Sequence, residues 1–121
     1  MQFSSPTLTN VTITGNTAEY FEGGGMHLLD SSNPTLINSI ISNNNPESID
    51  LSGDEEPIIT YSNIEGGWEG EGNIDANPLF INSEEGNFLL QTIELGYNNN
   101  SPCKGTGENG TDMGAFSNVI P

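Results

Sequence analysis

Basic residues are nearly absent from this chain of 121 residues. It contains a single lysine, Lys104, and no arginine, against 17 aspartates and glutamates, so its formal net charge is −16. Such a surface repels the phosphates of nucleic acids and the anionic face of a membrane. The composition therefore argues against nucleic-acid binding. Membrane insertion is not expected either, because no run of about 18 apolar residues is present.

Cysteine is almost as scarce. The one cysteine, Cys103, rules out an internal disulfide. The sequence offers it no neighbouring general base, so a small buried side chain is a better interpretation of Cys103 than a catalytic nucleophile. The chain also lacks the basic start and the apolar stretch that mark a secretion signal.

Helical periodicity is missing as well, since no window of about 11 residues carries a helical stripe. Apolar residues make up 32% of the sequence, which allows a modest core in one domain. They fall in short, β-branched runs broken by Gly, Pro, Asn or Asp, a pattern typical of strands and tight turns. The few aromatic residues suggest a disordered chain as the alternative. Disorder would not account for this regular alternation. The sequence predicts an all-β protein.

Two stretches of the chain repeat each other: "SSPTLTNVTITGNTA" at residues 4–18 and "SSNPTLINSIISNNNP" at residues 31–46. A third copy, "PIITYSNIEGG", follows at residues 57–67 with a shorter spacing. Unequal spacing between matched residues is typical of stacked coils, whose interior positions are fixed while the outer loops vary in length. The matched columns are Leu8, Leu36 and Ile59, then Asn10, Asn38 and Tyr61, then Ile13, Ile41 and Ile64.

Each repeat contains a second kind of strand after its loop. These strands are "GGGMHLL" at residues 23–29, "ESIDLSG" at residues 47–53 and "GNID" at residues 72–75. Two or three short strands per turn would wind as a parallel solenoid, with neighbouring coils at the usual strand spacing of roughly 4.8 Å. With its mid-strand asparagines and the start "GGGMHL", the sequence resembles the right-handed parallel β-helix proteins of the pectate-lyase-like superfamily.

The C-terminal part strengthens this resemblance. It contains "NIDANPLFINSEEGNFLLQ" at residues 73–91, "NSPCKGTG" at 100–107 and "TDMGAF" at 111–116. These phrases are similar, in the same order, to the closing module of bacterial secreted β-helix proteins, although Lys104 and Thr106 replace residues that are commonly Ile and Ala there. The resemblance implies an extracellular or cell-surface protein.

We therefore expect a right-handed parallel β-helix of about three to five coils. The coils would occupy residues 1–78, with repeats near 4–30, 31–56 and 57–78, and residues 79–121 would form a C-terminal capping segment. A solenoid needs such a cap because an open coil exposes unpaired backbone groups. No comparable segment precedes the first repeat, so self-association through an open N-terminal coil is a further expectation.

Asparagine in matched positions has a structural interpretation. Asn10 with Asn38, and Asn16 with Asn44, are expected to form ladders in turns, where amide side chains bond along the stack and Asn tolerates left-handed backbone. Asn10 also begins a formal glycosylation triplet, but such triplets are frequent in an Asn-rich chain.

Catalysis is not expected. Lyases of this fold that act on polyuronates need a basic residue, and Lys104 is the sole candidate. Hydrolases of the fold use carboxylates on neighbouring coils. If "MHL" aligns with "IDL", His27 lies over an outward Asp50, yet on an exposed sheet such a pair is more often a cross-strand polar contact than a catalytic dyad.

Two loops carry candidate binding residues. The acidic loop with Asp50, Asp54, Glu55 and Glu56 has the oxygen ligands that Ca²⁺ selects. Its spacing matches no known calcium loop, so a solvated acidic face is the favoured alternative. In the second loop, Glu65 and Glu69 flank the single tryptophan, Trp68. This side chain either stacks on a sugar ring of a polysaccharide or folds back over the coil.

These observations favour a non-catalytic structural or interaction module, such as a spacer, an adhesin or a self-assembling subunit. A carbohydrate-binding module is the alternative, and a fragment of a glycoside hydrolase is a less favoured one. No cofactor is expected apart from a possible Ca²⁺ ion.

Overall fold

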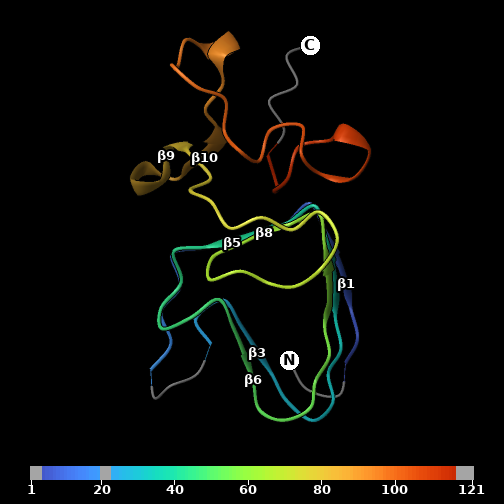
Figure 1. The fold of residues 1–121 in the computed structure, drawn as a ribbon. Helices are drawn as coiled ribbons and strands as arrows, with labels where there is room; N and C mark the ends of the chain where they lie inside the picture. Colours follow the sequence, from blue (N-terminus) through green and yellow to red (C-terminus); the bar gives the residue numbers. More distant parts are fainter. Residues whose placement is uncertain (1–3, 20–22, 117–121) are drawn as a thin grey trace.

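The computed structural model describes residues 4–19 and 23–116, and within them it shows three stacked coils (Figure 1). Three parallel sheets run along the stack, and each takes one strand from successive coils. The first sheet contains β1 (Thr7–Thr9), β4 (Thr35–Ile37) and β7 (Ile58–Thr60), and the second contains β2 (Thr12–Thr14), β5 (Ile40–Ser42) and β8 (Asn63–Ile64). The third, as far as the residues are described, contains β3 (Met26–Leu28) and β6 (Ile49–Leu51).

The strand register confirms the repeat predicted from the sequence. Leu8 pairs with Leu36 and Leu36 with Ile59, while Ile41 lies between Ile13 and Ile64 in the second sheet. The third sheet pairs Met26–Leu28 with Ile49–Leu51, so the alignment of "MHL" with "IDL" is also confirmed. Side chains of the same column therefore stack on one another.

A sharp corner joins the first sheet to the second in every coil. The corner residue is Asn10, Asn38 or Tyr61, and each has a left-handed backbone with φ of 54°, 55° and 51°. Asparagine accepts this conformation more readily than most residues other than glycine. The repeated asparagine thus marks the corner of the coil.

The core lies inside the stack and is built from inward-facing aliphatic residues. In the middle coil Leu36 and Ile41 are fully buried, whereas Leu8 and Ile13 of the first coil are only half-buried. Trp68 packs against the same cluster, whose buried members are Met26, Leu28, Leu36, Ile41, Ile49, Ile59 and Ile64.

The third coil is incomplete. After β8 the chain turns at Gly66 and Gly67, and the return segment runs back beside the same strand: Ile74 pairs with Asn63, and the N–H of Tyr61 donates to the carbonyl of Glu71. The stretch "GNID", expected to continue the sheet of β3 and β6, therefore stacks on β8 instead. In Figure 1 this return segment crosses inside the outline of the coils.

The C-terminal segment forms a separate layer beside the second sheet, above β5 and β8 in Figure 1. It contains the antiparallel pair β9 (Phe80–Asn82) and β10 (Asn87–Leu90), together with the short 3-10 helices η1 (Ser83–Glu85), η2 (Ile93–Leu95) and η3 (Glu108–Gly110). Its last part bonds to Thr12 of the first coil and to Asn38 of the second. The described part of the predicted capping segment, residues 79–116, therefore lies along the side of the stack, and residues 117–121 of that prediction lie outside the described residues.

A second apolar cluster holds this layer to the coils. It consists of Ile40, Leu90, Cys103 and Met113, all at most 1% exposed. Ile40 belongs to β5, so the second sheet contributes to both cores. None of the helices in the described residues is long and apolar enough to cross a membrane.

Candidate functional site

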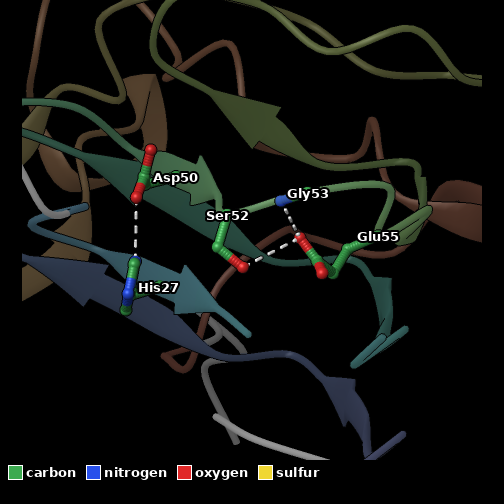
Figure 2. A network of polar contacts seen from close by, with 5 residues as sticks. All are labelled: His27, Asp50, Ser52, Gly53 and Glu55. Carbon is green, nitrogen blue, oxygen red and sulfur yellow. Dashed lines mark hydrogen bonds and ion pairs between the residues drawn. The ribbon is translucent and has the colours of Figure 1, made fainter. Parts of the chain in front are cut away.

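The outer face of the third sheet carries an ionisable pair. Because β3 and β6 are parallel and in register, His27 lies directly beside Asp50, and Nδ1 of the imidazole is 2.8 Å from Oδ2 of the carboxylate (Figure 2). Both side chains are 26% exposed. The pair is the cross-strand contact expected from the alternation of the strands, with Ile49 and Leu51 on either side of Asp50 along the chain.

Glu55 lies in the turn that follows β6, and its side chain is used by the backbone. It is only 5% exposed, and its carboxylate accepts hydrogen bonds from the N–H groups of Gly53 at 2.9 Å and Ser31 at 3.2 Å. Burial acts to raise the pKa of Glu55, but these hydrogen bonds outweigh it, and the pKa lies below its ordinary value. Figure 2 shows Glu55 turned toward Ser52 and Gly53.

The four predicted calcium ligands of the acidic loop do not point toward a common centre. Asp50 points to His27, Glu55 is turned to backbone donors, and Asp54 and Glu56 are exposed. Across the described residues, no group of three or more His, Cys, Asp or Glu side chains could hold a metal ion. The four predicted ligands are thus distributed over different contacts.

Trp68 folds back over the coil. Its side chain is half-buried against the main core, and it lines a shallow hollow of about 240 Å³ together with Ile49, Ile64 and Glu65. One carboxylate oxygen of Glu65 accepts a 2.9 Å bond from the N–H of Asn43, and Glu69 is exposed. Of the two interpretations of Trp68, the geometry favours the packing role.

The predicted asparagine ladders divide into two cases. Both the backbone N–H and the amide Nδ2 of Asn16 donate to Oδ1 of Asn44 at 3.0 Å, which is a ladder along the stack. Asn10 and Asn38 instead hold the C-terminal layer: Nδ2 of Asn10 donates to the carbonyl of Asp112, and Oδ1 of Asn38 accepts from the N–H of Glu108.

Cys103 is fully buried, as expected from the sequence. Its thiol receives a 3.2 Å contact from Nδ2 of Asn63, and burial raises its pKa above the ordinary value. The neighbouring Lys104 lies in the turn after Cys103, where its N–H donates to the carbonyl of Ser101.

Sequence reasoning missed a row of side chains just after the corners. Oγ of Ser39 accepts from the N–H of Val11 at 3.2 Å, and Oγ of Ser62 accepts from the N–H of Ser39 at 3.1 Å. Asn73 ends the row, because its Oδ1 accepts from the N–H of Ser62 at 3.1 Å. The two serines occupy matched positions of the repeat, and this match was the available signal.

The structure also contains a groove that the sequence did not predict. It measures about 550 Å³ and lies between the ends of the second-sheet strands and the start of the C-terminal layer. Two carboxylates, Glu65 and Asp75, line it together with Phe80, which also packs against the second apolar cluster. Its remaining lining residues are Thr14, Ser42, Asn43, Ala76, Asn77, Pro78 and Ser83.

Comparison with known proteins agrees with this architecture. The model of a family described as "right handed beta helix region" matches residues 2–106. No curated protein and no solved structure matches the chain. With its parallel strands in register from coil to coil and this match over most of its length, the chain belongs to the right-handed parallel β-helix family.

Proposed function

We propose that the chain is a non-catalytic structural and interaction module of an extracellular or cell-surface β-helix protein. The observation that carries the proposal is the use of its carboxylates. Asp50 bonds His27, Glu55 bonds the N–H groups of Gly53 and Ser31, and Glu71 accepts from the hydroxyl of Tyr61 at 3.0 Å. Carboxylates employed in this way fix the loops of a scaffold.

Rigidity supports the same role. The coils are joined by continuous parallel ladders, and a lateral layer ties the first coil to the second through Thr12 and Asn38. A solenoid of this kind holds its surface loops in fixed relative positions, which suits a spacer or a platform for partners.

Turnover assays test the non-catalytic part of the proposal. The purified chain is incubated with neutral, cationic and anionic polysaccharides, and new reducing ends and unsaturated products are followed over time. We expect no release above the buffer control. Time-dependent release that is abolished by Asp75→Asn or Asp50→Asn would overturn the proposal, and Glu84→Gln, an exposed change in η1, is the matched control.

Carbohydrate binding is the second candidate, and the groove lined by Glu65, Asp75 and Phe80 favours it. Polar side chains around an aromatic ring are suited to a sugar, and the two carboxylates suit a neutral or cationic glycan better than an anionic one. Retention on a polysaccharide that is lost in Phe80→Ala and kept in Trp68→Phe would support this groove.

Self-association is tested separately. Within the described residues β1 pairs only with β4 and β2 only with β5, which leaves their other edges without a strand partner. Light scattering over a range of protein and salt concentrations measures whether copies add to one another. A mass that increases with concentration would support a self-assembling subunit, and a constant monomer mass would favour a spacer or a binding platform.

A further inference from the structure

Among the described residues, the edge of β6 that faces away from β3 has no strand beside it. The N–H of Met26 donates to the carbonyl of Ser48, and the N–H of Ser52 donates to the carbonyl of Leu28. In a parallel ladder this register turns the backbone groups of residues 48, 50 and 52 toward β3. The N–H and C=O groups of Ile49 and Leu51 therefore point away from β3, and no described residue forms a strand with them.

The short third coil is the cause of this open edge. A complete coil would place a strand under β6, but the chain returns beside β8 after the Gly66–Gly67 turn. The open position beside β6 therefore results from the course of residues that the structure describes, and not from a chain end. Unpaired strand edges of this kind are templates for an additional strand.

The exposure of Leu51 marks the missing strand, although Ile49 on the same strand is only 9% exposed. Leu28 of β3 is fully buried, whereas Leu51, one coil further on in the same column, is 36% exposed. Next to it Ile49, Ile64 and Trp68 line the hollow of about 240 Å³. Apolar side chains of an added strand would cover Leu51 and enter this hollow.

The column of His27 and Asp50 indicates which charge an added strand would carry. An added strand in register would place its central side chain beside Asp50 on the outer face, on the side opposite to His27. Glu47 and Glu65 line the adjacent hollow, and both are exposed. With a net charge of −16 on the chain, a basic side chain fits this position, and a second copy of the chain would be repelled.

We propose that the open edge of β6 binds an extended segment of a partner protein with the pattern apolar, basic, apolar. The segment adds as a strand, bonds to the backbone of Ile49 and Leu51, and places its Lys or Arg beside Asp50. This inference rests on the proposed role as an interaction module and names the partner chemistry of one surface.

Hydrogen exchange provides the direct test. The probe is a synthetic peptide of about eight residues that alternates Val and Lys, a length typical of a β-strand. In the free protein the amides of Ile49 and Leu51 should exchange faster than those of Asp50 and Ser52, which face β3. Added peptide should slow exchange at Ile49 and Leu51 and change the fluorescence of Trp68, the only tryptophan.

Matched variants locate the effect. Leu51→Pro removes an outward N–H without removing a bond to β3, so it should weaken peptide binding by about tenfold or more. Thr9→Pro is the control, because the N–H of Thr9 also points out of its sheet, at the opposite end of the stack. Glu47→Gln should weaken binding by about threefold, as expected for an exposed charge, and Glu84→Gln should leave it unchanged.

Three results would overturn the proposal. One is the absence of protection at Ile49 and Leu51 at millimolar peptide, and another is equal binding of a peptide that alternates Val and Glu. The third is protection that grows with protein concentration alone, since this would make a second copy the occupant. The proposed non-catalytic role is tested by polysaccharide turnover, and this inference is tested by peptide binding. Failure of one is therefore distinguishable from failure of the other.

Discussion

Oδ1 of Asn38 accepts a 2.7 Å hydrogen bond from the N–H of Glu108, a residue 70 positions further along the chain. The backbone carbonyl of Asn38 accepts a second bond, also of 2.7 Å, from the N–H of Gly114. One corner residue therefore turns the second coil and holds the C-terminal layer. The side-chain bond to Glu108 can be separated experimentally from the turn, because only the turn depends on the left-handed backbone.

Replacement of Asn38 by Gly or by Ala makes this separation. Asn38→Gly keeps a residue that adopts φ near 55° freely but removes the side-chain acceptor, whereas Asn38→Ala also imposes strain on the corner. We expect faster hydrogen exchange at the Glu108 amide in both variants. Asn38→Ala should be less stable than Asn38→Gly by about 1 kcal/mol in chemical denaturation.

Gly107→Ala tests the same contact by changing the C-terminal layer instead of Asn38. A Cβ at Gly107 would lie 2.7 Å from Oδ1 of Asn38 and 2.9 Å from the carbonyl oxygen of Thr111, so the Asn38 side chain would have to move and the turn itself would be strained. Exchange at Glu108 should again increase. Unchanged exchange in all three variants would mean that the C-terminal layer is held without the Asn38 side chain.

In the row of side chains after the corners, the loss of stability should depend on how deeply the replaced serine lies in the stack. Ser62→Ala leaves the buried N–H of Ser39 without its acceptor, and an unsatisfied buried donor costs about 1 to 3 kcal/mol. Ser39→Ala deprives the half-buried Val11, where water can replace the lost acceptor, so it should cost less. Urea unfolding of both variants measures the order, and the reverse order would contradict it.

Cys103 should be unreactive while the chain is folded. Its side chain is fully buried, and burial raises its pKa, so little thiolate is present at neutral pH. A thiol reagent should label it many times more slowly in buffer than in denaturant. Rapid labelling of the folded chain would mean that the cluster with Leu90 and Met113 opens readily.

Much of the coil architecture was predictable because it repeats. Matched residues such as Leu36 and Ile59 stack directly, so their sequence offset gives the register. The course of residues 65–74 was not predictable, because "GNID" satisfies the strand pattern wherever it pairs. Its place beside β8 depends on the Gly66–Gly67 turn and on Trp68 covering the core.

The candidate site was predicted only in part. His27 and Asp50 follow from the register of two strands, which local sequence reveals. The burial of Glu55 does not, because it depends on the N–H of Ser31 from the preceding coil. The groove at Asp75 depends on where the C-terminal layer docks, and that docking is set by contacts more than 60 residues apart, such as Asn38 with Glu108.

Trp68 should act as a structural cover for the last coil. Trp68→Ala removes a half-buried aromatic from the core, and we expect a loss of roughly 2 to 3 kcal/mol in the free energy of unfolding. Trp68→Phe should recover much of this loss because a ring still packs against the main core. Full stability of the alanine variant would show that the tryptophan contributes little to the core.

Glu55 gives the protein a specific sensitivity to acid. Its pKa in the folded chain lies below its ordinary value, so folding favours the ionised form. The stabilisation is complete above the pKa of the unfolded chain, about 4.3, and is lost as the pH falls through the lower folded value. Glu55→Gln should therefore lower the midpoint of thermal unfolding at pH 7, and the difference from the wild type should shrink below about pH 4.

Global charge must be separated from this local effect, because acid also relieves the repulsion within a chain of net charge −16. Glu56→Gln is the matched control: it removes the same charge one position away, and the Glu56 side chain is exposed. Its thermal midpoint at pH 7 should equal or slightly exceed that of the wild type. A Glu55→Gln midpoint that follows the Glu56→Gln midpoint at every pH would mean that the backbone bonds of Glu55 do not stabilise the turn after β6.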